Sequence, residues 1–114
     1  MNIFKHGAVA LLALGLVACD SEGEGTDDGS TAVDRTAEIA SLATDTVNGE
    51  AYYQANCSVC HGPNGEGVSG PALSGEVLED VIDVVLEGPG SMPSFDDRPD
   101  QDLADVAAYV VETF

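Results

Sequence analysis

Two cysteines and a histidine stand close together in the middle of the chain, in the run Cys57-Ser58-Val59-Cys60-His61. On a helical turn, residues three positions apart lie on roughly the same side of the backbone, so both thiols can reach one edge of a single flat partner. This spacing attaches a c-type haem through two thioether bonds, and the histidine ligates the iron from one axial side. The motif therefore predicts one haem c, bound covalently through Cys57 and Cys60, with His61 as a metal ligand.

The same cysteine spacing also occurs in zinc sites and in thiol redox pairs. A structural zinc site needs four ligands, and the chain has only three cysteines and two histidines, one of each near the N-terminus. A thioredoxin-like pair should follow a strand, and no alternating strand pattern precedes Cys57. Haem is therefore favoured. A haem-free domain with a structural bridge between Cys57 and Cys60 is left as an alternative.

Residues 1–18 have the layout of a secretory signal peptide. Lys5 and His6 form a short basic start, and the apolar or small residues that follow are too few to span a bilayer as a mature helix. Residues 16–19, Leu-Val-Ala-Cys, resemble the bacterial lipobox, which implies cleavage before Cys19 and a lipid on this cysteine. We therefore expect a protein anchored by lipid on the periplasmic side of a bacterial membrane, inner or outer. An ordinary signal peptide that ends near a cysteine is the alternative.

Residues 19–45 are predicted to be the lipidated cysteine and an acidic, flexible linker. Residues 21–30 contain no large apolar side chain, so they cannot bury enough surface to offset the entropy of folding. Apolar side chains return in residues 34–42 and favour a helix there.

Acidic residues dominate the charge of the whole chain, with 21 Asp and Glu against 3 Lys and Arg and a formal net charge of -18. Nucleic acid and anionic lipid surfaces would repel such a chain. A protein partner attracted by charge should therefore carry basic docking patches. Adaptation to high salt, where acidic charge aids solubility, is the alternative explanation.

Met92 is the side chain best suited to complete the coordination of a haem iron. Once the signal peptide is removed, Met92 is the only methionine, His61 is the only histidine and no lysine remains. Residues 88–93, Gly-Pro-Gly-Ser-Met-Pro, cannot form a regular helix and can present the thioether from a loop. A thioether opposite histidine raises the reduction potential relative to two histidines. The sequence thus predicts His61 and Met92 as axial ligands, with simple core packing of Met92 as the alternative.

Residues 46–114 are predicted to form one small domain. Asn48 suits the N-cap of a first helix that runs into the haem motif. A second helix is expected over residues 76–87, where the following Gly-Pro pair ends it, and a third over residues 102–112.

The third helix has the clearest two-faced pattern. Its apolar face is formed by Leu103, Val106, Ala107 and Val110, and the opposite face by Asp102, Asp105 and Glu112. Gly- and Pro-rich loops separate the helices, and no strand is expected. The prediction is an all-α fold in which three main helices and these loops surround one haem, which adds the apolar core that so small a domain lacks.

From about Asn48 to the C-terminus the chain resembles the class I cytochromes c of the short bacterial monohaem type. Besides the Cys57 to His61 motif and Met92-Pro93, matching positions are Gly49 and Tyr53 in the first helix, Tyr109 in the last helix, and Pro71. The resemblance implies that the first and last helices cross closely at the glycine. It also implies that the Pro71 carbonyl accepts a hydrogen bond from Nδ1 of His61. Many family members surround the haem edge with lysines, whereas this domain has only Arg98 against thirteen acids from Glu50 onward.

The resemblance implies a one-electron carrier rather than an enzyme, with no catalytic residue, because the cofactor carries the redox chemistry. We expect a monomer whose partners are redox proteins, such as a quinol-oxidising complex, a terminal oxidase or a periplasmic dehydrogenase. A five-coordinate haem with Met92 displaced, acting on peroxide or sensing a gas, is the alternative function.

Overall fold

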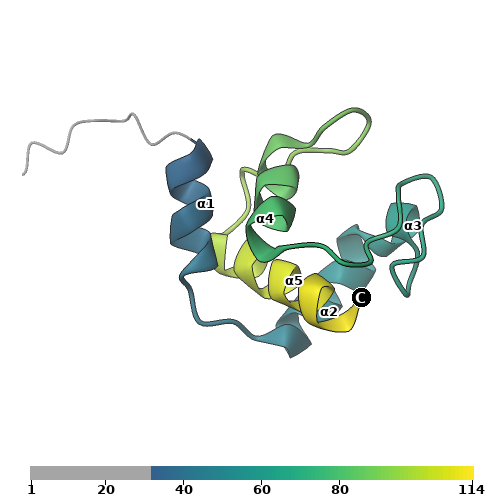
Figure 1. The fold of residues 1–114 in the computed structure, drawn as a ribbon, viewed down its shortest axis with the longest axis horizontal. Coiled ribbons are helices and arrows are strands. Elements are labelled where there is room, and N and C mark those ends of the chain that lie inside the picture. The colour runs from purple at the N-terminus through teal and green to yellow at the C-terminus, as the bar shows by residue number, and fades with distance from the viewer. Residues whose placement is uncertain (1–31) are drawn as a thin grey trace, which may run out of the picture.

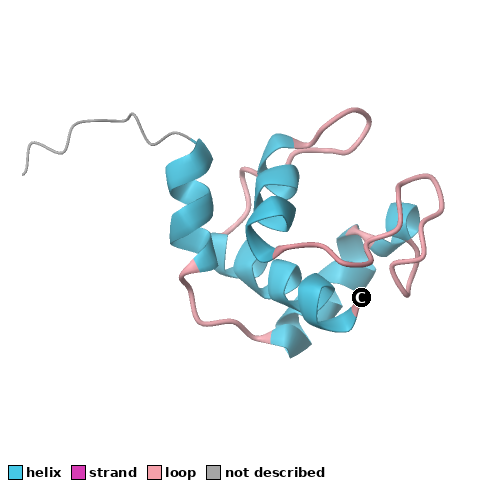
Figure 2. Cartoon of the chain, in the orientation of Figure 1, coloured by secondary structure: helices cyan, strands magenta, loops and turns pink. Residues whose placement is uncertain are grey.

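The computed structural model describes residues 32–114, which form five helices and no strand (Figures 1 and 2). The helices are α1 (Ala32–Ala40), α2 (Thr46–Asn56), α3 (Ser58–His61), α4 (Leu78–Glu87) and α5 (Asp100–Thr113). Within this part of the chain no helix is long and apolar enough to cross a bilayer. The all-α prediction is confirmed. The predicted signal peptide, Cys19 and the linker up to residue 31 lie outside the described residues.

The last helix, α5, runs through the middle of the domain, with α2 against it and with α4 and α1 on another side (Figure 1). The α2 and α5 backbones meet at Gly49, where an added Cβ would lie 2.1 Å from the Asp105 carbonyl oxygen. The rings of Tyr53, Tyr109 and Phe114 pack beside this crossing with centroids 5.2 to 5.7 Å apart. The close crossing implied by the sequence resemblance is thus observed, and only glycine allows it.

The start of α2 differs from the sequence prediction. Asp45, not Asn48, is the N-cap, and its carboxylate accepts from the backbone N–H groups of Val47 at 2.9 Å and Asn48 at 3.3 Å. Asp45 stands directly before the helix, so its side chain reaches the free N–H groups of the first turn. The Asn48 amide instead donates to the Asp105 carboxylate at 2.7 Å.

Asp105 is buried, with 2% of its surface exposed, although the helical pattern placed it on the solvent face of α5. That prediction is wrong because the N-terminal turn of α2 covers this side of α5. The carboxylate accepts hydrogen bonds from the Asp45 backbone N–H at 2.9 Å and from the Asn48 and Gln101 amides at 2.7 Å each. Burial alone would raise the pKa of the Asp105 carboxyl, but these hydrogen bonds outweigh burial and hold the pKa below its usual value.

The helix expected within the linker exists as α1, and it packs against α4 and α5. Ile39 is fully buried in a core cluster that also contains Ile82, Phe95 and Leu103. The Thr36 hydroxyl donates to the Asp83 carboxylate on α4. The structure therefore places a packed helix inside the segment that was predicted to be linker. Sequence reasoning missed this packing because the apolar residues of the segment indicate a helix but do not show which distant elements it contacts.

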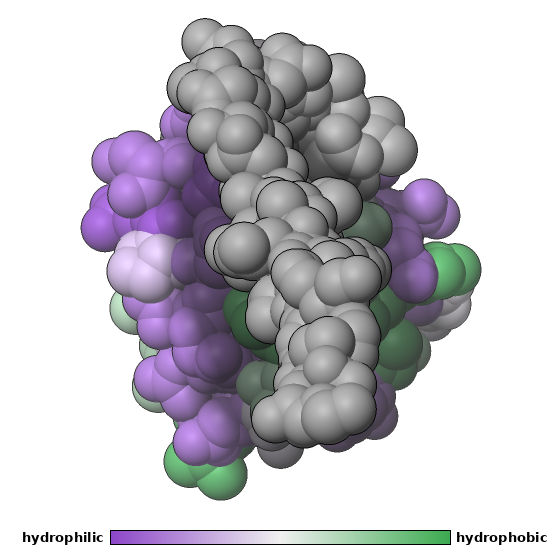
Figure 3. All heavy atoms as spheres, turned by 90° about the vertical axis from the view of Figure 1, so that its left-hand side faces the viewer, coloured by the Kyte–Doolittle hydropathy of each residue, from purple (hydrophilic) through white to green (hydrophobic). Residues whose placement is uncertain are grey.

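The boundaries of α4 and α5 lie close to the predicted ones. The first turn of α4 starts at Leu78 rather than Glu76, and α5 is longer than predicted at its N-terminal end. Gly88 ends α4 in the left-handed conformation with φ of 62°, as the Gly-Pro pair indicated. In Figure 3, which looks at the side that carries α1, the described residues visible around the grey atoms are mostly hydrophilic on the left of the view, and hydrophobic areas appear at the right and at the lower edge.

Candidate haem site

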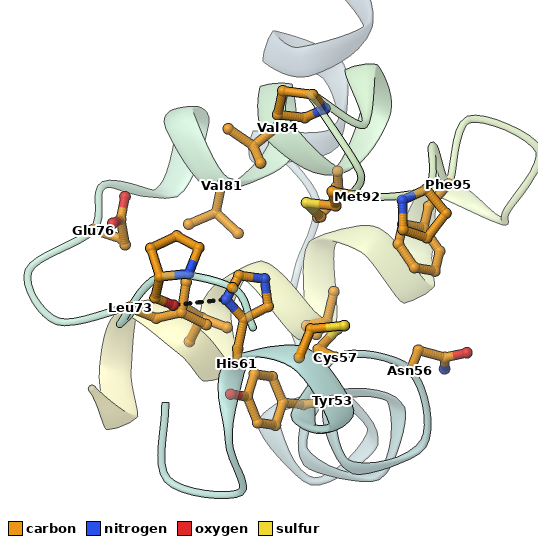
Figure 4. Close-up of a pocket in the computed structure, with 18 of the residues that line it drawn as sticks. Tyr53, Asn56, Cys57, His61, Leu73, Glu76, Val81, Val84, Met92 and Phe95 are labelled. Carbon is orange, nitrogen blue, oxygen red and sulfur yellow. Dashed lines mark hydrogen bonds between the residues drawn. The ribbon is translucent and has the colours of Figure 1, made fainter. Parts of the chain in front are cut away.

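A pocket of about 440 Å³ lies between the α2–α3 segment on one side and α4 with its following loop on the other (Figure 4). Cys57, Cys60, His61, Pro71 and Met92 all line it. Every site residue that the sequence predicted within the described part of the chain is therefore brought to one pocket. Its volume is within the usual range for small-molecule and cofactor sites.

The two cysteines stand where α2 gives way to α3. Cys57 ends α2, its backbone N–H donating to the Tyr53 carbonyl at 2.8 Å, and the short α3 turn then presents Cys60 and His61. Cys57 is half-buried and Cys60 is exposed, and both thiols are free. Burial in the apolar wall, helped by the neighbouring Cys60, raises the pKa of the Cys57 thiol to about 11. In the absence of haem this thiol is therefore uncharged at neutral pH.

The His61 ring is oriented by the loop that follows it. Its Nδ1 lies 2.8 Å from the Pro71 carbonyl oxygen, the contact drawn as a dashed line in Figure 4. A carbonyl can only accept, so this hydrogen bond requires the proton on Nδ1 and leaves the lone pair on Nε2 for a metal. Gly70 lets the loop approach, because an added Cβ there would lie 3.0 Å from the imidazole Cε1.

The loop behind the imidazole is tied back to the haem motif. The N–H of Gly67 donates to the His61 carbonyl at 2.7 Å, and the N–H groups of Val68 and Gly70 donate to the Cys60 carbonyl at 3.0 and 2.8 Å. The Tyr53 hydroxyl donates to the Gly62 carbonyl at 2.6 Å from inside the core. These bonds hold the backbone around His61 in place and so orient the imidazole without the help of a metal.

Met92 lies in the loop between α4 and α5, across the pocket from His61. Figure 4 shows the imidazole and the thioether reaching into the pocket from opposite sides. The loop is closed by hydrogen bonds from the N–H of Met92 to the Pro89 carbonyl at 3.1 Å and from the N–H of Phe95 to the Val85 carbonyl at 2.8 Å. Gly88 brings the two ends together, since a Cβ there would lie 2.3 Å from the Ser94 nitrogen.

The rest of the pocket wall is mostly apolar. The aliphatic and aromatic lining residues come from three helices and two loops, and they are Tyr53, Leu73, Val81, Val84, Val85, Phe95, Val106 and Val110. Sequence reasoning placed several of them on helix faces but did not assign them to this site, and it missed Phe95 and Leu73. The only signal was local: Phe95 follows the Met-Pro pair closely, and Leu73 follows Pro71.

These features fit a haem. The pocket combines two thiols on one wall, an imidazole nitrogen and a thioether facing each other, and an apolar lining for a flat macrocycle. This donor set, with one nitrogen, one neutral sulfur and two anchoring thiols, is suited to an iron porphyrin rather than to a bare cation.

Residues 44–110 match the family model described as cytochrome c oxidase, cbb3-type, subunit III. The chain belongs to the c-type cytochromes. A cytochrome c-553-like protein of Synechocystis is 36% identical over 78 residues, which are 64% of this chain and 73% of that protein. Cytochrome c6 of Thermosynechococcus vestitus is 36% identical over 83 residues, covering 64% of this chain and 74% of the relative. Cytochrome c-551 of Bacillus subtilis is 39% identical over 89 residues, covering 72% and 70%.

As in other c-type cytochromes, the cofactor is a covalently bound haem c, and Cys57 and Cys60 have the spacing that attaches it. The matched segment begins at residue 44, so it contains the whole pocket. Helix α1, which ends at Ala40, lies outside the matched segment.

Proposed function

We propose that this cytochrome is a one-electron carrier whose haem iron is ligated by His61 and Met92, and that it is tethered to a membrane while it exchanges electrons with respiratory redox partners. The observation that carries the proposal is the placement of His61 and Met92 on opposite sides of the pocket that also holds Cys57 and Cys60. When bound, the haem supplies reversible uptake of one electron, with no need for a catalytic side chain.

The protein's own residues set the conditions for that exchange. The Pro71 carbonyl fixes the Nδ1 proton of His61 and makes the imidazole a stronger donor at Nε2. Met92 offers a neutral thioether, which favours the ferrous state. The aliphatic side chains of the wall make the space between them largely apolar, and apolar surroundings also raise the potential because they disfavour the extra charge of ferric iron.

One edge of the pocket faces solvent, where a partner could approach. Cys60 is exposed, and so are Val59 beside it and Val84 on the pocket wall. Glu76 also lines the pocket, within a domain whose surface is strongly acidic. A small encounter surface of this kind suits transient electron transfer. The partners proposed are a quinol-oxidising complex, a terminal oxidase or a periplasmic dehydrogenase with basic docking patches, and the rate of electron transfer to them should fall as salt is added.

The membrane anchor is proposed at Cys19. Because α1 packs on the domain, residues 20–31 lie between this cysteine and α1, and a chain of that length can span at most about 45 Å. The haem domain would then remain near the membrane surface on the periplasmic side, where anchoring raises its effective concentration for membrane-bound partners. Mass spectrometry of the mature N-terminus tests this, since an unmodified Cys19 would refute the anchor.

The ligand assignment is tested by replacing Met92 with alanine in the haem-loaded protein. Loss of the thioether should remove the sulfur-to-iron charge-transfer band of the ferric protein and lower the reduction potential by on the order of 100 mV, a fraction of the ~0.8 V range that axial ligands control. A redox-titrated absorption spectrum measures both quantities.

Ser91→Ala is the matched control, because Ser91 lies beside Met92 in the same loop and has no iron-binding sulfur. It should leave the band and the potential in place. An unchanged spectrum in the Met92→Ala variant would refute the assignment. If the unmodified protein lacked the band and bound carbon monoxide rapidly, the five-coordinate alternative would replace this proposal.

A further inference from the structure

Arg35 on α1 is hydrogen-bonded to the loop that carries Met92. Its Nε and one terminal nitrogen donate to Oδ1 of Asp100 at 3.1 and 2.8 Å. The other terminal nitrogen donates to the Asp96 backbone carbonyl at 2.7 Å, and the Arg98 carbonyl accepts a further bond at 3.3 Å. One guanidinium therefore joins three separate points over residues 96–100, where the loop passes into α5.

Arg35 is one of very few basic side chains in this acidic protein. In residues 32–114 the only Lys or Arg side chains are Arg35 and Arg98. The Arg98 side chain is about half exposed and only approaches its neighbour Asp97 at 3.6 Å. Arg35, by contrast, is half-buried and satisfies both a carboxylate and backbone carbonyls, a combination that the planar five-donor guanidinium allows and an ammonium does not.

The loop from residue 88 to residue 99 is held at two places. On the α4 side, the N–H of Phe95 bonds to the Val85 carbonyl at 2.8 Å and the Ser94 hydroxyl bonds to the Leu86 carbonyl at 2.6 Å. On the α5 side, Arg35 holds the turn that starts at Phe95, in which the N–H of Arg98 bonds to the Phe95 carbonyl at 3.0 Å. Phe95 therefore takes part in both attachments, its N–H on the α4 side and its carbonyl in the turn that Arg35 holds, and Met92 lies three residues before it.

Apolar packing also connects α1 to the loop that carries Met92. Ile39 of α1 and Phe95 of the loop belong to one buried cluster, and Met92 packs against the edge of that cluster. Helix α1 thus reaches the methionine loop both through the Arg35 hydrogen bonds and through shared apolar packing. Since α1 lies outside the segment that matches the cytochrome family model, this support is an addition to the domain that the model describes.

We propose that Arg35 is a positioning residue for the iron ligand Met92: by fixing the turn at residues 95–98, it keeps the thioether directed into the haem pocket and slows opening of the loop. This inference rests on the proposed His61 and Met92 ligation. Without the guanidinium the loop keeps its hydrogen bonds to α4 but loses those to Arg35 of α1. The turn that begins at Phe95 then moves more freely, Met92 loses the fixed neighbour against which it packs, and the thioether dissociates from the iron more often.

The test compares Arg35→Gln, Arg35→Lys and Arg98→Gln in the haem-loaded protein. Arg98→Gln is the matched control, because it also removes one positive charge next to this loop but leaves the Arg35 hydrogen bonds, including the one to the Arg98 backbone carbonyl, in place. Two quantities are measured: hydrogen exchange of the backbone amides of residues 88–99, and the binding of imidazole to the ferric haem, which requires an open iron position.

In Arg35→Gln, exchange in the loop and the affinity for imidazole should both rise about tenfold, the size expected for loss of charge-assisted hydrogen bonds. Exchange in α2 should not change. Arg35→Lys should lie close to Arg35→Gln, since it restores charge but not the fork, and Arg98→Gln should match the unmodified protein.

Each other result overturns the inference in a different way. Unchanged loop exchange in Arg35→Gln would show that the guanidinium does not hold the loop. Equal acceleration in α2 and in the loop would show a general loss of stability instead of positioning. Faster loop exchange with unchanged imidazole binding would show that Arg35 holds the loop but that the mobility of the loop does not affect ligation by Met92. If Met92→Ala also left imidazole binding unchanged, the ligation proposal itself would have failed, and exchange alone would then decide whether Arg35 holds the loop.

Discussion

The carboxylate of Asp105 is buried under the first turn of α2 and accepts three hydrogen bonds there. An aspartate on a helix is ordinarily solvent-exposed, and only the covering turn of α2 makes this one a buried acceptor, so the helical pattern did not reveal it. The haem donors Cys57, Cys60, His61 and Met92, which line one pocket, were evident from the sequence because few residue types can form thioethers with a haem or ligate its iron.

Asp105 leads to a prediction about stability and pH. Asp105→Asn removes the charge and replaces one of the two accepting oxygens by an NH2 group, which then faces at least one of the three donors, and it should cost about 2 kcal/mol of unfolding free energy at pH 7. The folded-state pKa of the carboxyl is lowered, so its stabilising contribution is complete above the ordinary value of about 3.9 and is lost as the pH falls through the folded pKa. The difference between the two proteins should therefore shrink below about pH 4.

Thermal unfolding of the haem-loaded protein between acidic and neutral pH measures this difference. Asp102→Asn is the control, because Asp102 is less buried and accepts only one 3.3 Å bond, from Asn48. It should change stability little. A loss in Asp105→Asn that stayed the same down to the lowest pH would show that shape, and not ionisation, is what the site requires.

Helices were predicted correctly where the spacing of apolar residues and the residues typical of helix ends indicated the same segment. The helices α4 and α5 were found within two residues because each combines an apolar stripe with a Gly or Pro boundary. The short helix α1 shows where this reasoning fails. Its residues favour a helix, but docking depends on Ile39 entering a cluster built by α4, α5 and the methionine loop, which are distant in sequence.

Docking of α1 predicts the cost of truncating its buried side chain. Ile39→Ala should lower the free energy of unfolding by about 2 to 4 kcal/mol, because it leaves a cavity in a closed cluster. Leu42→Ala, which truncates a side chain 37% exposed just past the helix, should cost less than about 1 kcal/mol. Denaturant titration of the haem-loaded protein measures both. Equal small losses would mean that α1 does not stabilise the domain and that the linker prediction holds up to residue 45.

At the scale of the whole molecule, the described residues form two apolar clusters, and side chains of both clusters line the haem pocket. One contains Val85 and Phe95, the other contains Val106 and Val110, and side chains from both face the same space of about 440 Å³. A haem in this space would contact both clusters and convert them into one core. The sequence indicated this dependence only through the small size of the domain.

Removal of haem should therefore affect the fold unevenly. In a Cys57→Ala, Cys60→Ala double variant, which cannot form thioethers, we expect α2 and α5 to stay paired through the Gly49 crossing while α4 and the methionine loop lose their support. Helix content by circular dichroism should fall, and the melting temperature should drop by about 10 °C or more, because a tightly bound ligand of the folded state has been lost.

Val59→Ala is the matched control, since Val59 stands between the two cysteines and is 77% exposed. It should retain haem, helix content and melting temperature. Hydrogen exchange in the double variant shows which helices depend on haem, because protection should persist in α2 and α5 and disappear in α4. A double variant that kept native helix content and protection in α4 would show that the polypeptide forms its core alone. The haem would then not be needed to join the two apolar clusters into a stable core.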